Sequence, residues 1–347
     1  MRQARSGRGR NRLTAASMTS PARPFNTDFR QFRDPRNGAE LIHDGDALVA
    51  PDGTRYPIVD HIPRFVPAGN YADDFGAQWN RFPRTQLDSH TGLSLTRDRL
   101  ARCLRGELDQ VKGKRVLEAG SGAGRFSEVL LQAGADLHSF DFSGAVSANA
   151  LNNGHSPNLT LAQGDVRCPP YPAESYDYVI CLGVIQHTPD PEQTIAALWR
   201  MVKPGGRLVI DHYRFRWRFA LPTPVGDAGS VYRWAILRLP AHKRAGLVQR
   251  LTDFWFPIHW RWRDSLMMQR IIRRFSPLRF YYPDMALKDR AMHYEWSLLD
   301  THDCTTDYFK HLRSPDSIRA TLAGLGAEQI DVAIGGNGVE AWCVKPA

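Results

Sequence analysis

The sequence lacks the cysteine pairs that would hold a structural zinc ion or a disulfide framework. Its five cysteines are far apart, and no two of them form a C-x-x-C pair: Cys103, Cys168, Cys181, Cys304 and Cys343. An odd, scattered set in a chain of 347 residues is typical of reduced thiols in the cytosol. We therefore expect free thiols, no cysteine-held zinc ion and a cytoplasmic location.

The sequence also lacks a long hydrophobic run. No apolar stretch approaches the roughly 18 residues that a transmembrane helix needs. Met1 to Met18 lack the apolar segment of a secretory signal peptide. Residues 1–27 contain six arginines and no acid, which predicts a disordered basic tail, with a mitochondrial transit peptide as the alternative. The sequence excludes an integral helical membrane protein.

Positive charge is concentrated in two parts of the chain. The formal net charge is +9, and residues 1–27 and 214–293 together hold a larger positive surplus than that. The remaining residues are therefore net negative. This distribution argues against a protein that binds nucleic acid over its whole surface, and it predicts a localised basic face.

The order of apolar segments predicts an α/β protein with additions. Residues 28–67 are rich in turns, with short strands expected at 56–59 and 62–66, and residues 68–112 have a helical pattern. Apolar strands then alternate with helical stretches over residues 113–213 and again over 294–347. This alternation predicts a doubly wound, mostly parallel sheet covered by helices on both faces.

A glycine-rich turn follows the first strand of this core. The run VLEAGSGAG places Gly120, Gly122 and Gly124 in a G-x-G-x-G pattern, two residues after Glu118. Glycines let the backbone approach a ligand closely, and the next helix N-terminus then faces the ligand's polar end. A dinucleotide site would have its third glycine one position later, where Arg125 stands. The spacing therefore favours the zwitterionic methionine part of S-adenosylmethionine over a pyrophosphate.

Two further acids follow the next strands. Asp141 ends the second strand, where a carboxylate can accept hydrogen bonds from both ribose hydroxyls. Asp165 and Val166 end the third strand, where an acid and a backbone N–H suit the amino group and a ring nitrogen of adenine. Ligands bind doubly wound folds at these strand ends, so the three positions predict one nucleoside site.

Four runs in this order resemble the class I S-adenosylmethionine-dependent methyltransferases: VLEAGSGAGRF, SFDFSGA, GDVRCPPYPAESYDYVICLGVIQHTPDP and KPGGRLVI. The resemblance implies a seven-stranded, Rossmann-like sheet with an antiparallel final strand. It also implies that Glu118 and the three glycines of the turn hold the methionine part. Asp141 would hold the ribose, and Asp165 with Val166 the adenine. The complete cofactor-binding set is Glu118, Gly120, Gly122, Gly124, Asp141, Phe142, Asp165, Val166 and Leu182.

Two other functions remain open at this point. A nicotinamide-dependent oxidoreductase would use the same kind of fold, although the third glycine is misplaced for it. A catalytically inactive methyltransferase-like protein that binds a partner is the non-enzymatic alternative. The complete set of Glu118, Asp141 and Asp165 favours a working cofactor site.

The N-terminal segment carries a second resemblance. Within residues 28–67, positions 34–66 resemble the zinc-ribbon-like segment that precedes some bacterial methyltransferases. Such segments have a C-P-x-C-G knuckle and a second cysteine pair, followed by Y-P-I and G-I-P. Here the knuckle reads DPRNG at residues 34–38, and no ligand position holds a cysteine. We therefore expect a metal-free segment held by its apolar strands.

Methyl transfer from a sulfonium is an in-line displacement, so a base is needed only when the acceptor remains protonated. His187 follows the fourth strand and His212 ends the fifth, and both are candidates because imidazole titrates near neutrality. The alternative for His187 is that it bonds its own loop and caps the next helix. Neither histidine, nor the set of His302, Asp303 and Asp211, has the spacing of an established metal motif.

Residues 214–293 form a basic, aromatic-rich insertion. They contain five of the nine tryptophans: Trp217, Trp234, Trp255, Trp260 and Trp262. Helical spacing over 264–275 predicts an apolar face of Met267, Met268, Ile271, Ile272 and Phe275 opposite Gln269, Arg270, Arg273 and Arg274.

Three roles compete for this insertion. The first is a lid over a small-molecule or lipid- or sugar-linked acceptor, which would be anionic. The second is peripheral attachment to a membrane. The third is RNA binding, which is disfavoured because no nucleic-acid module is present. The expected reaction is methyl transfer, most simply to oxygen.

Overall fold

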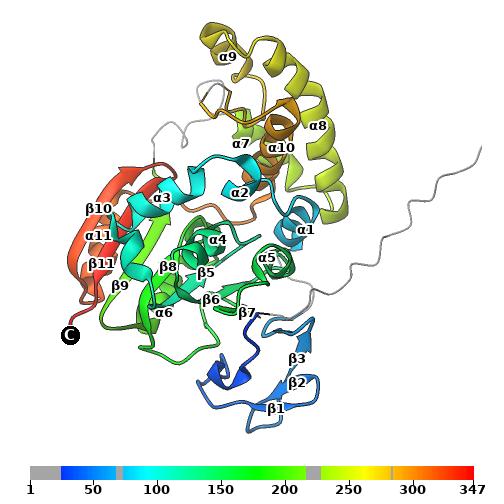
Figure 1. Cartoon of the computed structure of the whole chain (residues 1–347). Helices are drawn as coiled ribbons and strands as arrows, with labels where there is room; N and C mark the ends of the chain where they lie inside the picture. Colours follow the sequence, from blue (N-terminus) through cyan, green and yellow to red (C-terminus); the bar gives the residue numbers. More distant parts are fainter. Residues whose placement is uncertain (1–24, 68–72, 216–227, 283) are drawn as a thin grey trace, which may run out of the picture.

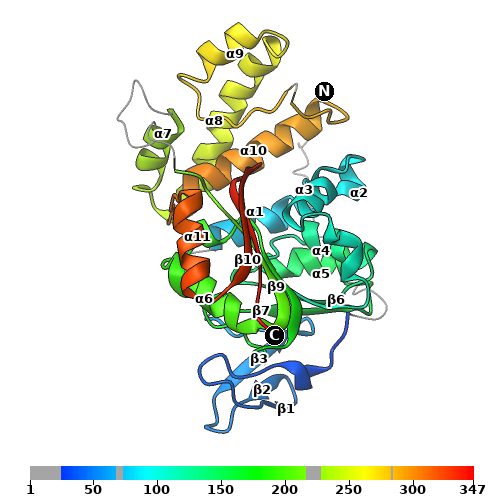
Figure 2. The same ribbon diagram turned by 90° about the vertical axis from the view of Figure 1, so that its left-hand side faces the viewer.

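The computed structural model describes residues 25–67, 73–215, 228–282 and 284–347 (Figures 1 and 2). The predicted basic tail, except for residues 25–27, and Trp217 lie outside these residues. None of the helices within the described ranges is long and apolar enough to cross a membrane. The five cysteines are all unpaired.

A seven-stranded sheet forms the centre of the protein. Its spatial order is β10-β11-β9-β8-β5-β6-β7, and only the pairs that involve β11 are antiparallel. This arrangement confirms the predicted doubly wound fold with an antiparallel final strand. The strands are β5 (Arg115–Ala119), β6 (Asp136–Asp141), β7 (Leu159–Gln163), β8 (Tyr176–Cys181), β9 (Val202–His212), β10 (Glu328–Gly335) and β11 (Gly338–Val344).

Helices bury an apolar core on each face of this sheet. One face is covered by α6 (Pro191–Met201) and α11 (Pro315–Gly324), through side chains such as Leu198 and Leu322. The other is covered by α3 (Leu95–Cys103), α4 (Arg125–Gln132) and α5 (Val146–Asn153), through side chains such as Leu100 and Val129. The central strands are buried on both sides, which is why they read as continuous apolar runs.

Two of these helices begin with a side-chain cap followed by a proline. The side chain of Asp190 accepts a hydrogen bond from the backbone N–H of Gln193, and Pro191 is the first residue of α6. Ser314 caps α11 in the same way, with Pro315 as its first residue. Proline fits there because the first helical N–H has no intrahelical partner.

Residues 203–206, which contain a proline and two glycines, lie inside a strand. β9 begins at Val202, which pairs with Tyr176, whereas Arg207 pairs with Tyr178. The intervening glycines therefore form a bulge within β9, and Gly205 has a φ of +72°. A bulge of this kind keeps the strand paired although extra residues are inserted.

The N-terminal segment forms a separate four-stranded antiparallel sheet, which follows the short helix η1 (Phe29–Gln31). Its strands are β1 (Ile42–Asp44), β2 (Ala47–Val49), β3 (Arg55–Val59) and β4 (Ile62–Pro63). The last two correspond to the predicted strands, although β4 ends three residues earlier than expected. The sheet attaches to the edge of the main sheet, because the N–H of Phe65 donates to the carbonyl of Gln163 at 2.8 Å.

An arginine joins the two turns of this small sheet. The guanidinium of Arg36 contacts the carboxylates of Asp34, at 2.6 Å, and Asp52, at 2.9 Å. The Asp34 side chain is completely buried and also accepts a hydrogen bond from the hydroxyl of Tyr56. These bonds hold the pKa of Asp34 below its usual value, Arg36 being the main cause. The two turns are therefore joined by a buried carboxylate and its arginine.

The helices before the main sheet are α1 (Asp73–Arg81), α2 (Asp88–Thr91), α3 and η2 (Glu107–Val111). A second group of helices, which we call the helical layer, lies at the opposite end of the molecule from the N-terminal sheet (Figures 1 and 2). It consists of α7 (Ala228–Ile236), α8 (Ala241–Arg261), α9 (Leu266–Ile272) and α10 (Arg290–Thr306). Because α10 packs on α7 and α8, the layer extends beyond residue 293, where the sequence placed its end.

The orientation of α9 differs from the sequence prediction. Gln269 and Ile272 face inward, whereas Met267, Ile271 and Phe275 are exposed on the same outer side as the arginines. The reason is a polar anchor. The side-chain amide of Gln269 donates to the carbonyl of His259 at 2.9 Å, and its oxygen lies 2.7 Å from the Nδ1 of His259. The apolar residues of this segment therefore do not share one buried face, as the apolar periodicity alone would suggest.

Candidate active site

A cavity of about 890 Å³ lies where the parallel strands of the main sheet end. Its floor comes from residues that follow β5, β6 and β8, namely 120–123, 141–143 and 182–184. The helical layer closes the opposite side with residues of α7, α10 and the segment 279–285. Seven of the predicted site residues line it: Gly120, Gly122, Asp141, Phe142, Val166, Leu182 and His187. Ligands bind α/β sheets at this edge.

The glycine turn forms the floor next to β5. Gly120, Gly122 and Gly124 have φ values of +80°, +52° and +85°, a region that residues with a Cβ rarely adopt. A Cβ at Gly120 would overlap the side chain of Val184, and one at Gly122 would lie 3.4 Å from the ring of Trp79. Gly124 does not line the cavity, because it packs against Asn149 on α5. Its role is to bring α4 and α5 together.

Asp141 is held at the cavity wall by backbone and side-chain donors. The N–H of Gly122 donates to one carboxylate oxygen at 2.8 Å. The N–H and hydroxyl of Ser143 donate to the other at 2.8 and 2.7 Å. Burial nevertheless raises the pKa of this carboxyl above its usual value. The oxygen bound by Gly122 accepts only this one hydrogen bond and retains capacity for a further one from a ligand.

Glu118 lies beneath this floor and does not line the cavity. The hydroxyls of Ser127 and Ser139 donate to its Oε2, whereas Oε1 is buried and has no hydrogen-bond partner among the described residues. Burial raises the pKa of Glu118 to about 7. The carboxyl is thus close to half-protonated at neutral pH.

The residues that were predicted to contact adenine do not all face the cavity. Val166 and Leu182 line the cavity, but Asp165 does not. The Asp165 carboxylate is bound by the guanidinium of Arg167, whose Nη2 lies 2.6 Å from it. A contact between Asp165 and an adenine stays a prediction.

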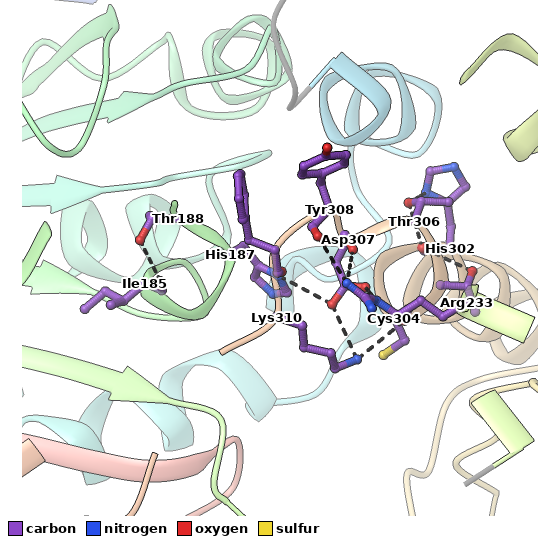
Figure 3. A network of polar contacts seen from close by, with 12 residues as sticks. Ile185, His187, Thr188, Arg233, His302, Cys304, Thr306, Asp307, Tyr308 and Lys310 are labelled. Carbon is purple, nitrogen blue, oxygen red and sulfur yellow. Dashed lines mark hydrogen bonds and ion pairs between the residues drawn. The ribbon is translucent and has the colours of Figure 1, made fainter. Parts of the chain in front are cut away.

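The two candidate histidines differ in their access to the cavity. His187 lines it, and its Nδ1 lies 3.2 Å from the carbonyl oxygen of Phe309 and 3.7 Å from the Asp307 carboxylate (Figure 3). Burial and nearby Lys310 lower the pKa of His187 to about 3, so the ring is neutral at physiological pH. His212 is buried outside the cavity wall, and its Nδ1 lies 3.1 Å from the carbonyl oxygen of Tyr213.

Charged groups of the helical layer surround His187. The Asp307 carboxylate is fully buried, and it pairs with the Nε of Arg233 at 2.5 Å and with the Nζ of Lys310 at 3.4 Å (Figure 3). These groups come from α7, the end of α10 and the segment that follows it. The pairing leaves Asp307 bound by two cations, and both cations line the cavity.

Two further acids of α10, Asp300 and Asp303, line the cavity. Asp300 is bound by the amide of Gln86 at 3.0 Å and the indole N–H of Trp296 at 3.2 Å. The Asp303 carboxylate has neither a hydrogen bond nor an ion pair within the described ranges. Burial, followed by repulsion from Asp300 and Asp307, raises the pKa of Asp303 to about 7. From the sequence, the cluster that contains Asp303 is a candidate for shaping the acceptor pocket or stabilising a loop, but nothing there marks Asp303 as a base.

The residues considered for a divalent ion do not assemble. Asp211 accepts a hydrogen bond from the N–H of Gly183 at 2.6 Å and pairs with Arg99. The His302 Nδ1 lies 3.2 Å from the hydroxyl of Thr306. The described part of the chain holds no group of three or more histidine, cysteine or acidic residues arranged to bind a metal.

The core of the chain resembles a known protein family. Residues 117–210 match the family model described as a methyltransferase domain. The matched residues run from β5 to β9 and contain the glycine turn, Asp141 and the first candidate histidine. The helical layer and the N-terminal sheet lie outside the match.

Curated relatives match about a third of the chain or less. A ubiquinone biosynthesis O-methyltransferase of Pseudomonas fluorescens is 38% identical over 100 residues, and the protein of that name in Coxiella burnetii is 30% identical over 118 residues. These alignments cover 28% and 33% of this chain. The chain spans only 43% and 50% of the lengths of these relatives.

A solved structure of Methanococcus maripaludis, described as an S-adenosyl-L-methionine-dependent methyltransferase, is similar at 13% identity with a TM-score of 0.42. The alignment covers 81% of this chain and 97% of that chain.

Proposed function

We propose that this protein is an S-adenosylmethionine-dependent methyltransferase that methylates an oxygen of a small-molecule or lipid- or sugar-linked acceptor. The observation that carries the proposal is the Asp141 carboxylate, held by Gly122 of the glycine turn at the edge of one large cavity. The match of residues 117–210 to a methyltransferase domain supports it. The names of the relatives in Pseudomonas and Coxiella favour oxygen as the acceptor atom.

The residues of the cavity fit the parts of this cofactor. Gly120 and Gly122 leave the floor without side chains, where the methionine part needs close approach. The hydroxyl of Ser121 is buried beside them and has no hydrogen-bond partner among the described residues, so it can bind the polar end of the methionine. Asp141 supplies acceptors for the ribose hydroxyls, and Val166 with Leu182 supplies an apolar contact for the adenine.

The cofactor would supply a methyl group on a sulfonium, which is transferred by in-line displacement. An acceptor hydroxyl must lose its proton during this transfer, and the base works best when its pKa is close to the ambient pH. We propose Asp303 as the proton acceptor, since it faces the cavity without a partner and its pKa is about 7. His187, with a pKa of about 3, would hold the loop and the acceptor instead.

The charges of the cavity wall favour an anionic acceptor. Among the described lining residues, cationic side chains outnumber acidic ones. The cations are Arg99, Arg125, Arg214, Arg233, Arg279 and Lys310, and the acids are Asp141, Asp300 and Asp303. Arg99 is already paired with Asp211, and Arg233 and Lys310 with Asp307, so a carboxylate or phosphate on the acceptor would chiefly meet Arg125 and Arg214.

Calorimetry tests the cofactor proposal. The purified chain is titrated with S-adenosylhomocysteine and, separately, with NAD. We expect the first to bind and the second not to bind, and we expect Asp141→Asn to weaken the first. Binding of NAD alone would replace the proposal with a nicotinamide-dependent oxidoreductase. A methyl-transfer screen against anionic hydroxylated metabolites follows, and cofactor binding without transfer to any acceptor would favour the inactive alternative.

We further propose that residues 28–67 are a zinc-ribbon-like segment in which the Asp34–Arg36–Asp52 bridge replaces the metal. The bridge joins the turn at 34–38 to the turn at 51–53, the two positions where cysteine pairs would meet. Elemental analysis of the purified chain checks this proposal. Stoichiometric zinc would contradict it.

A further inference from the structure

The corner between α8 and α9 exposes an unusual number of large apolar side chains. We call residues 261–275 the α9 tip. Its exposed apolar residues keep between 41% and 68% of their surface accessible: Trp262, Leu266, Met267, Ile271 and Phe275. Five large apolar side chains exposed within fifteen residues suggest an interaction site, because soluble proteins rarely expose large apolar patches.

These side chains cannot turn inward without breaking buried polar contacts. Gln269 is anchored to His259 by the contacts described above and also donates to the carbonyl of Trp262 at 3.1 Å. The Nε2 of His259 lies 3.0 Å from the hydroxyl of Ser276. Ile272 fills the apolar space beside this network. The outward orientation of Met267 and Ile271 is therefore built into the fold.

The tip is also strongly basic. Arg261, Arg270 and Arg274 are exposed and interspersed with the apolar side chains, and Arg273 is exposed with one donor bound to the carbonyl of Phe280 at 2.8 Å. The acid of the tip is Asp264, which lies 3.7 Å from Arg263. Apolar groups and arginines thus share one surface, with a clear positive excess.

The tip projects away from the rest of the molecule. In both views, α9 lies at the outer end of the helical layer, beyond α10 and far from the main sheet (Figures 1 and 2). A projecting corner presents little flat area to a rigid protein partner. A bilayer, in contrast, can surround a projecting group of apolar side chains while its headgroups meet the arginines.

We propose that the α9 tip docks the protein on a membrane surface rich in anionic lipids. The apolar side chains of Leu266, Met267, Ile271 and Phe275 enter the boundary between headgroups and acyl chains. The neighbouring arginines bind lipid phosphates. Exposed apolar groups provide the salt-independent part of the attachment, and the arginines provide the part that salt screens.

This surface belongs to the layer that closes the cavity. α10 packs on α8 and contributes Asp300 and Asp303 to the cavity wall. Docking through α9 therefore keeps the acceptor side of the cavity near the bilayer, as a lipid-linked acceptor requires. The docking itself does not depend on the proposed methyl transfer, since it is measured without cofactor or acceptor.

Vesicle sedimentation tests the docking. The full chain is mixed with vesicles of phosphatidylcholine, or of phosphatidylcholine and phosphatidylglycerol, at low and high salt. We expect binding to the anionic vesicles that weakens as salt rises. Met267→Ser/Ile271→Ser should reduce binding about tenfold or more at both salt concentrations. Arg270→Gln/Arg274→Gln should reduce it about tenfold at low salt, with a smaller effect at high salt.

The matched control is Ile42→Ser/Val59→Ser, which removes two exposed apolar side chains of the N-terminal sheet and should leave vesicle binding unchanged. All replaced side chains are exposed, so circular dichroism and melting temperature should be unchanged. The proposal is overturned if the wild-type chain ignores anionic vesicles at low salt, or if the tip variants bind as the wild type does. It is also overturned if sedimentation shows a dimer that Met267→Ser/Ile271→Ser dissociates, because a second copy then covers the tip.

Discussion

The backbone N–H of Gly122 donates a hydrogen bond to the carboxylate of Asp141 at 2.8 Å. This bond joins the turn after β5 to the end of β6, two strands that pair along their whole length. The side chain that would bind ribose hydroxyls is thereby oriented by the turn that would contact the methionine part. The two halves of the proposed cofactor site form one unit.

Asp141→Asn tests this unit directly. Replacement of the carboxylate by an amide removes a charged acceptor, so the dissociation constant of S-adenosylhomocysteine should rise about tenfold or more. The matched control is Asp136→Asn at the opposite, exposed end of the same strand, which should bind as the wild type does. Calorimetry measures both. Equal affinities for the two variants would remove Asp141 from the cofactor site.

Glu118 should make the stability of the cofactor-free protein depend on pH. Burial raises its pKa from 4.5 to about 7 in the folded state, so the folded protein binds the proton more tightly than the unfolded chain does. The contribution of this group to stability is therefore present below the unfolded pKa and falls as pH rises to about 7. The loss corresponds to roughly 3 kcal/mol at 1.36 kcal/mol per pKa unit.

The Glu118→Gln variant has no titratable group at position 118. Urea unfolding at about pH 5 and about pH 8 should show that the variant gains stability relative to wild type as pH rises. A difference that does not change between the two conditions would show that Glu118 has an ordinary pKa.

Gly124→Ala should destabilise the protein without touching the cavity. The new Cβ would overlap Asn149, and the backbone there has a φ of +85°. We expect a loss of about 2–4 kcal/mol in the free energy of unfolding. Gly106→Ala has a similar φ of +86° but open space around the Cβ, so it should lose only about 1 kcal/mol. Similar losses for both would mean that strain alone, rather than the contact between α4 and α5, requires the glycine.

Asp303→Asn should lower turnover about 10²–10⁴-fold if its carboxylate accepts the acceptor proton. Because the active form is deprotonated, kcat/KM of the wild type should rise with pH and level off above about 7, the pKa of Asp303. The variant should lose this dependence while it retains affinity for S-adenosylhomocysteine.

His187→Gln serves as the comparison for Asp303→Asn. The pKa of His187 is about 3, so the ring is neutral at physiological pH and is a weak base. This substitution should therefore change turnover less than about tenfold. A large loss in His187→Gln together with a mild effect in Asp303→Asn would assign the proton to the histidine.

Arg36→Ala should destabilise the N-terminal sheet. It leaves the completely buried carboxylate of Asp34 with only the Tyr56 hydroxyl and local backbone contacts. We expect a loss of about 1–3 kcal/mol, measured by urea unfolding. Arg55→Ala, which removes an exposed ion pair with Asp44, should cost about 0.5 kcal/mol or less. Equal effects would show that the bridge between the two turns contributes no more than a surface pair.

The position of α9 shows where a periodic pattern is insufficient. Of the five apolar residues at helical spacing, Ile272 is buried, and it shares the inner side with Gln269 because His259, ten residues earlier, supplies partners for the Gln269 amide. A hydrophobic pattern weighs each residue by its own preference and contains no information about which distant polar group will lie opposite. The orientation of this helix is therefore a property of the folded chain.

Patterns among neighbouring residues predict the central strands, the glycine turn and the place of Asp141 at a strand end, because strand periodicity, turn stereochemistry and the edge at which parallel strands end all follow from neighbouring residues. Only the tertiary structure decided that Gly124 packs against Asn149 rather than the cavity, that Asp165 is bound by Arg167, and that Asp303 faces the cavity. The physical reason is distance along the chain. The burial of Asp303 depends on the position of α10 over the cavity floor, whose residues lie more than a hundred positions earlier in the chain. No local pattern encodes that contact.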